Sequence, residues 1–112
     1  PRFYVLLAEH NGRAIGYAVF FETYSTFLAK PTMYLEDIFV LEEERRCGAG
    51  RALLREVARA AIRRGCGRME WQVLTWNTPA MEFYRRLGAA PLEEWQPFRM
   101  AEEQFYRLAE SE

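Results

Sequence analysis

"LEEERRCGAGRALLREVARAAIRRG" (Leu41–Gly65) runs three acidic residues and two arginines into two glycines and then into a long amphipathic segment. Gly65 and Gly67 follow as helix-ending residues. Between Gly50 and Arg64 the apolar positions fall on one helical face: Leu53, Leu54, Val57, Ala58, Ala61 and Ile62. The spacing therefore predicts a helix over 50–64 that begins at a glycine-rich turn.

Glycines between a strand and a helix let a phosphate group approach the exposed N–H groups of the helix N-terminus. A P-loop requires a lysine directly after its last glycine, and Gly50 is followed by Arg51. A dinucleotide fingerprint would place a third small residue at position 53, where this chain has Leu53. Two interpretations of the glycines remain: a shorter pyrophosphate cradle of the form Arg-x-x-Gly-x-Gly, and a plain strand-to-helix turn.

Upstream of this stretch the pattern is that of strands. Asn11–Gly12 separates two apolar runs, which is a strong hairpin signal and predicts antiparallel strands over Phe3–His10 and Arg13–Tyr24. Ser25–Pro31 is predicted as a loop, and Thr32–Leu41 as a third strand rich in aromatic and β-branched residues.

Downstream of the helix, Arg68–Thr75 alternates as a strand. Thr78 before Pro79 predicts a helix N-cap, and Gly88 ends that short helix. Weaker patterns predict strands near 89–93 and 95–100 and a helix over about 101–109. The expected fold is a single domain over 1–112, a mixed α/β (α+β) structure with a mostly antiparallel central sheet and flanking helices.

Composition excludes several classes of protein. Fifteen basic and sixteen acidic side chains give a formal charge of −1, which speaks against a nucleic-acid binder. No run approaches the roughly 18 apolar residues of a membrane span. Cys47 and Cys66 are too few for a disulfide scaffold or a zinc site, so we expect no metal and a reducing, cytoplasmic location.

Three segments are informative beyond the local pattern: "YLEDIFVLEEERRCGAGRALL", "VLTWNTPAMEFYRRLGA" and the closing "WQPFRMAEEQFYRLA". Together they resemble the GNAT family of N-acetyltransferases, and within it the spermidine/spermine (diamine and thialysine) branch. The likeness extends over essentially the whole chain. Family members normally open with a strand and one or two helices that this sequence lacks, and Arg46 stands where a glycine is common.

The resemblance implies acetyl-CoA as co-substrate. Arg45, Gly48, Gly50 and Arg51 would contact the pyrophosphate, mostly through backbone N–H groups of the turn: Arg46, Cys47, Gly48, Ala49, Gly50 and Arg51. The pantetheine arm would pair like an extra strand with Phe39, Val40 and Leu41, where the third and fourth strands splay. Asn77 would hold the same arm or cap the following helix.

The resemblance also implies the acid–base residues. Glu36 would be the water-mediated base and Asp37 would help to hold a cationic acceptor; the alternative is that both are ordinary exposed strand residues. Neighbours on a strand point to opposite faces, so the two carboxylates share a face only if the strand carries a bulge. Tyr84 would be the general acid, or else a core aromatic residue beside Phe83 and Leu87.

The expected function is transfer of an acetyl group from acetyl-CoA to a primary amine of a small polyamine- or diamine-like acceptor, by a homodimer. Two alternatives stay open. One is a non-catalytic acyl-CoA-binding or structural remnant of the family, and the other is an acetyltransferase that acts on a protein amine.

Overall fold

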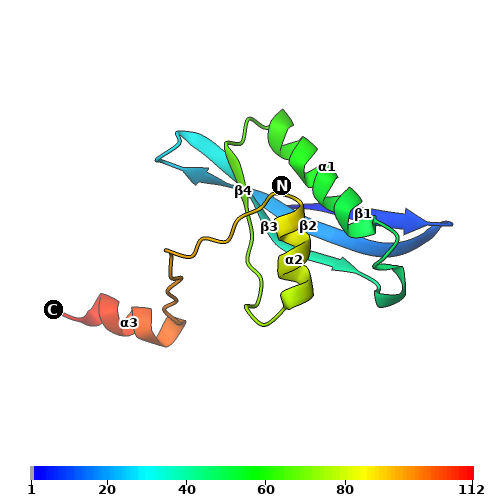
Figure 1. Ribbon diagram of the computed structural model, residues 1–112. Coiled ribbons are helices and arrows are strands. Elements are labelled where there is room, and N and C mark those ends of the chain that lie inside the picture. The colour runs from blue at the N-terminus through cyan, green and yellow to red at the C-terminus, as the bar shows by residue number, and fades with distance from the viewer. Residues whose placement is uncertain (1) are drawn as a thin grey trace. The chain divides into compact units, whose positions relative to one another are not determined.

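The structure, a computed structural model, describes residues 2–112 and contains one four-stranded sheet (Figure 1). Its strands are β1 (Tyr4–His10), β2 (Arg13–Ser25), β3 (Lys30–Val40) and β4 (Arg68–Glu70), in that spatial order. The first three pair antiparallel, and β4 runs parallel to β3. The chain divides into two compact units, one up to Val73 and one from Leu74 to Glu112.

The predicted β1–β2 hairpin is confirmed. Asn11 and Gly12 have φ angles of +54° and +75°, so both turn residues are left-handed, as a two-residue hairpin requires. The second hairpin is tighter than expected. Ser25 pairs with Lys30, so the connection that was predicted over 25–31 is a turn of residues 26–29.

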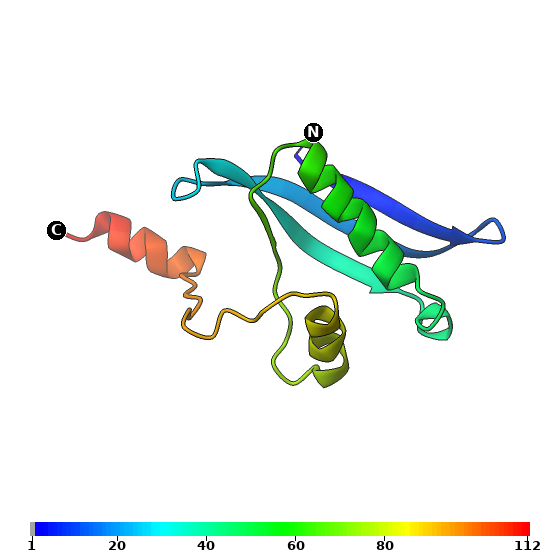
Figure 2. The ribbon, with the colours of Figure 1, turned by 45° about the horizontal axis from the view of Figure 1, so that its top comes forward.

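Helix α1 (Ala49–Arg63) lies across one face of the β1–β2–β3 sheet (Figure 2). Its buried side chains are Ala49, Leu53, Leu54, Val57, Ala60 and Ala61. The buried side chains of the sheet include Ala18, Phe20, Met33 and Leu35. Each buried leucine or methionine contributes roughly 1.5–3 kcal/mol, so this layer is the core that holds the strands in register.

The end of α1 is fastened to the sheet. Gly65 has a φ of +71°, the left-handed conformation that ends a helix. Arg64, just before it, bonds the carboxylate of Glu22 at 2.9 Å and stacks over the ring of Tyr4 at 4.1 Å. The predicted helix therefore exists within one residue of the expected bounds and is anchored to β1 and β2.

The second unit contains α2 (Thr78–Arg86) and α3 (Glu102–Glu110). The strand that was expected over 68–75 is only the three residues of β4. The strands that were predicted near 89–93 and 95–100 are wrong: the chain there is irregular. Pro91 and Pro97 lack the N–H that a sheet ladder needs, which makes both segments poor strands.

We predict that Gly16→Ala destabilises the fold by about 1–3 kcal/mol. A Cβ at Gly16 would lie 2.6 Å from the backbone oxygen of Phe39, so β2 and β3 would have to separate. Gly67→Ala is the matched control, because the atoms nearest its Cβ would be side-chain atoms of Leu28 and Lys30, at 3.2–3.3 Å, and not backbone at 2.6 Å. Urea unfolding of both variants measures the difference, and equal losses would contradict the close approach at Gly16.

Candidate functional site

Strand β3 carries an extra residue at Glu36. Asp37 pairs with Val19 and Leu35 pairs with Phe20, so Glu36 has no partner on β2. This is a β-bulge, which puts two residues of one strand opposite one residue of its neighbour. Because β3 carries this bulge, Glu36 and Asp37 can lie on the same face of the sheet although they are neighbours in the sequence.

Both carboxylates lie on the sheet face opposite α1. Asp37 is in register with Val19, whose neighbours Ala18 and Phe20 point to the buried face. Glu36 lines a depression of about 400 Å³ together with Val19, Phe21, Phe3 and Arg2. Both acidic residues are exposed, so the structure brings together two negative groups beside a depression that is lined by apolar side chains and by Arg2.

Tyr17, which the sequence analysis did not select, contacts this pair. Its hydroxyl donates a hydrogen bond of 2.8 Å to Oδ2 of Asp37. That bond, with burial and the negative charge of Asp37 as further causes, raises the pKa of Tyr17 above its ordinary value of about 10. Only the register between β2 and β3 makes the two residues neighbours, so no local pattern would have identified Tyr17.

Beyond Tyr34, the outer edge of β3 no longer pairs with β4. The two strands pair only from Thr32 to Tyr34, so their pairing ends before the bulge and earlier than Phe39–Leu41, where splaying was expected. The N–H of Leu41 bonds Ile15 on β2, and the carbonyl of Val40 in the same peptide unit therefore points to the opposite, outer side. This edge is where the pantetheine arm was expected.

Arg45 hydrogen-bonds the outward-pointing carbonyl of Val40. Its Nε donates a hydrogen bond of 2.9 Å to the oxygen of Val40, and its guanidinium lies 5.8 Å from the centre of the Phe39 ring. Arg45 thus connects the end of β3 to the start of the glycine turn. Of the backbone groups expected to pair with pantetheine, one already has a side-chain donor.

The glycine turn has the properties of an anion site. Gly48 is the N-cap of α1 with a φ of +86° and supplies no side-chain cap, and the first turn of α1 contains no acidic residue. The leading N–H groups of a helix lack intrahelical partners, and here no capping side chain takes one. Arg46 and Arg51 are exposed beside them. These features fit a pyrophosphate group.

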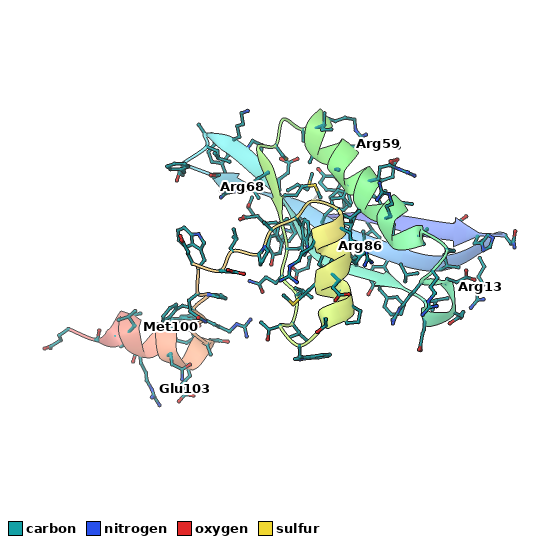
Figure 3. All side chains as sticks on the ribbon, viewed as in Figure 1. Arg13, Arg59, Arg68, Arg86, Met100 and Glu103 are labelled. Carbon is teal, nitrogen blue, oxygen red and sulfur yellow. The ribbon has the colours of Figure 1, made fainter. Side chains whose placement is uncertain are left out.

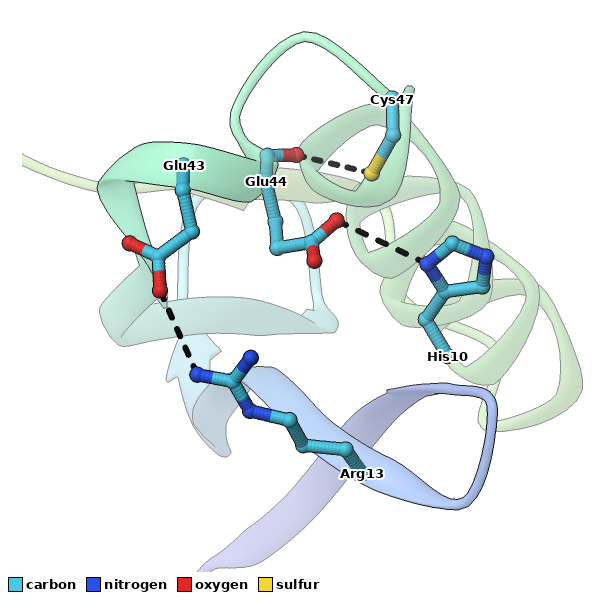
Figure 4. Close-up of polar contacts among 5 residues, drawn as sticks. All are labelled: His10, Arg13, Glu43, Glu44 and Cys47. Atoms are coloured by element: carbon cyan, nitrogen blue, oxygen red, sulfur yellow. Dashed lines mark hydrogen bonds and ion pairs between the residues drawn. The ribbon is translucent and has the colours of Figure 1, made fainter.

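Polar contacts join the turn to the β1–β2 hairpin (Figure 4). The short 3-10 helix η1 (Glu42–Glu44) supplies the carboxylates: Glu44 lies 3.6 Å from His10, and Glu43 lies 3.3 Å from Arg13. Cys47 donates its Sγ–H to the backbone oxygen of Glu44 at 2.8 Å. The acidic run thus links the strand-to-helix connection to the β1–β2 hairpin, and exposed pairs of this kind contribute little stability.

The four arginines that are spaced four residues apart on α1 face solvent. Arg51, Arg55, Arg59 and Arg63 are all exposed, and Arg59, labelled in Figure 3, pairs with Glu56 at 2.8 Å. Among residues 2–112 no three His, Cys, Asp or Glu side chains are grouped so that they could hold a metal ion. None of the described helices has the length and apolar composition needed to cross a membrane.

Two site residues from the sequence lie in the second unit. Asn77 is the N-cap of α2, and its Oδ1 accepts a hydrogen bond of 3.3 Å from the N–H of Ala80. The prediction of Thr78 as the cap is wrong by one residue, because the amide oxygen of Asn77 reaches the N–H three residues on. Tyr84 is half-buried on α2, with its ring 5.6 Å from that of Phe83.

Comparison with known proteins identifies the family. Residues 1–89 match the model of the acetyltransferase (GNAT) family. The chain belongs to this family. The family resemblance read from the sequence is thereby confirmed, and so is the expected fold class.

Named relatives of this GNAT chain act on amines. L-ornithine N5-acetyltransferase NATA1 of Arabidopsis thaliana is 46% identical over 85 residues, which are 76% of this chain and 37% of that protein. Thialysine N-epsilon-acetyltransferase of Bos taurus is 39% identical over 98 residues, which are 85% of this chain and 57% of that protein. The chain thus spans well under two thirds of the length of these two relatives.

A solved relative shares the fold. The aminoglycoside N-acetyltransferase AAC(6')-Iy, in complex with CoA, superposes with a TM-score of 0.79 at 26% identity. The match covers 90% of this chain and 78% of that one.

We expect Arg45→Ala to lower the free energy of unfolding by about 1 kcal/mol, because Val40 loses its hydrogen-bond donor. For a domain of this size that loss corresponds to about 4 °C in melting temperature. Arg46→Ala is the control: Arg46 is exposed and makes no hydrogen bond or ion pair with the described residues, so its change should stay within about 0.5 kcal/mol. Thermal unfolding of both variants tests this, and equal melting temperatures would contradict the structural role of Arg45.

Proposed function

We propose that this chain is an acetyl-CoA-dependent N-acetyltransferase that acts on a primary amine of a small polyamine- or diamine-like acceptor. The observation that carries the proposal is the bulge at Glu36, which gathers two exposed carboxylates on one face where β3 and β4 part. The family of the chain and its amine-acetylating relatives support the reaction type.

Acetyl-CoA, as co-substrate, supplies an activated acetyl thioester. Arg46, Cys47, Gly48, Ala49, Gly50 and Arg51 would hold its pyrophosphate, mostly through their backbone N–H groups. An uncapped helix N-terminus with a left-handed glycine at its N-cap and flanking arginines supports this assignment. Phe39, Val40 and Leu41 would hold the pantetheine arm along the outer edge of β3, with Arg45 positioned at the carbonyl of Val40.

The two carboxylates act on the protonated acceptor amine. An alkyl amine with a pKa near 10.4 is protonated at pH 7, so exposing its lone pair costs about 4–5 kcal/mol. Glu36, acting through water, accepts that proton, and the neutral nitrogen then attacks the thioester carbonyl. Asp37 binds the cationic acceptor beside it.

Tyr84 gives a proton to the departing thiolate. A phenol with a pKa near 10 and a thiol near 8.5 make this transfer slightly uphill, so its contribution is moderate. Asn77 has a second use as the cap that starts α2, the helix that carries Tyr84.

The acceptor class follows from the carboxylate pair and the relatives. Two adjacent negative groups on an apolar face suit a molecule with a second cationic group and a short hydrocarbon chain. Ornithine and thialysine, which appear in the names of two relatives, are of this kind. We also propose a homodimer, since Trp95, Phe98, Phe105 and Tyr106 in the C-terminal part expose 47–94% of their surface.

The first test of this function is calorimetric titration with acetyl-CoA. The wild-type chain should bind with micromolar affinity, and Gly50→Val should abolish binding while the domain stays folded, because a branched side chain would crowd the N–H groups at the start of α1. Circular dichroism checks the fold of the variant. Equal binding by both proteins would show that the cradle lies elsewhere, and no binding by a folded wild-type chain would contradict the proposed co-substrate.

Tyr84→Phe tests the general acid. The hydroxyl is lost and the ring is kept, so we expect kcat to fall by about 10²-fold, the low end of general-acid effects, while the dissociation constant of acetyl-CoA changes little. Tyr106→Phe, the same change on α3, serves as control. Unchanged turnover of the Tyr84 variant would remove this residue from the mechanism.

A further inference from the structure

Tyr17 and Asp37 form a pair that the proposed reaction does not by itself require. Tyr17 is opposite Phe39 in the β2–β3 ladder, and Asp37 is two residues along β3 from Phe39 on the same face. The Tyr17 ring packs against that of Phe39, with 5.8 Å between centroids. This contact aims the Tyr17 hydroxyl along the sheet to Oδ2 of Asp37, 2.8 Å away.

The two neighbouring carboxylates therefore have different surroundings. Asp37 is a paired residue of the ladder and accepts the bond from Tyr17. Glu36 is the bulged residue, and within residues 2–112 its carboxylate has no hydrogen-bond donor and no ion pair. The carboxylate of Asp37 is therefore held by a hydrogen bond, whereas the carboxylate of Glu36 can rotate.

We propose that Tyr17 is a positioning residue that fixes Asp37 as the anchor for the second ammonium group of the acceptor. This role rests on the proposed acetyltransferase function. A carboxylate offers about four lone-pair sites, and Tyr17 uses one, on Oδ2. The remaining sites, including Oδ1, accept N–H groups of the ammonium, while the free Glu36 serves the amine that reacts.

A phenol suits this role because it is a neutral donor. A hydrogen bond to an ionised carboxylate favours the ionised form and orients it, without neutralising the charge that attracts the acceptor. The pKa of Tyr17 is raised, first by its hydrogen bond to Asp37, so the phenol stays protonated below pH 10 and ionises only above its ordinary range. Tyr17 therefore remains a donor at any pH at which the reaction would be assayed.

The contact itself can be tested without catalysis. In protein labelled at the tyrosine ring carbons, NMR titration should show Tyr17 ionising at higher pH than an ordinary tyrosine, with the signal assigned by its loss in Tyr17→Phe. Asp37→Asn removes the negative acceptor and should lower the pKa of Tyr17 toward the ordinary value. An identical Tyr17 titration in the wild type and the Asp37 variant would overturn the proposal.

The role is tested by acceptor kinetics with two probes of equal chain length, 1,4-diaminobutane and butylamine. Tyr17→Phe should raise KM for the diamine about tenfold, leave kcat within about twofold, and leave KM for the monoamine unchanged. Tyr34→Phe is the matched control. Its ring lies on the same face, packed on Phe21 at 5.4 Å, and its hydroxyl has no partner among the described residues.

The outcomes separate the two proposals. Equal KM increases for diamine and monoamine, or the same effects in Tyr34→Phe, would overturn the anchoring role and leave the acetyltransferase function intact. A wild-type chain that acetylates neither amine nor any other acceptor would overturn the proposed function and this role with it. The tyrosine titration would still report whether the Tyr17–Asp37 contact exists.

Discussion

The pairing of β2 with β3, with one residue too many on β3, is the constraint on which the rest of this site depends. Core residues fix the register on both sides of Glu36, because Phe20 faces Leu35 and Gly16 faces Val40 on the side covered by α1. The surplus residue cannot be absorbed by slipping the strand, since a slip of one position would turn every buried side chain to the other face. The bulge is therefore locked in by the hydrophobic core.

The same strand connects the acidic pair to the glycine turn. Close approach of Gly16 to the backbone of Phe39 keeps the end of β3 against β2, and the Val40 carbonyl is thereby directed outward, where Arg45 bonds it. Arg45 stands only a few residues before the left-handed Gly48 that begins α1. Burial of α1 against the sheet consequently determines where the N–H groups of the turn lie relative to the edge of β3.

How much could be predicted from the sequence depended on the range of the interactions involved. The Asn11–Gly12 hairpin, α1 and the glycine turn follow from local conformational preferences, and they were predicted nearly to the residue. For α2, Asn77 and Thr78 both have side chains suited to capping and both were expected as caps; Thr78 was wrong and Asn77 is the residue that caps the helix. The two strands expected near 89–93 and 95–100 do not form, because Pro91 and Pro97 lack the N–H that pairing needs. From the sequence, a bulge was known only to be necessary if Glu36 and Asp37 were to share a face, and Tyr17 was not identified at all. Both features depend on pairing between residues about twenty positions apart.

In the proposed reaction Asp37 binds the cationic acceptor and Glu36 takes a proton from the reacting amine, although the two acids are adjacent on one strand. The register separates them. The extra residue that brings Glu36 to the face of Asp37 also excludes Glu36 from the ladder, whereas Asp37 stays paired and within reach of Tyr17. A single extra residue thus places the two carboxylates on one face of the sheet and gives them different surroundings, which suits the separate roles proposed for them.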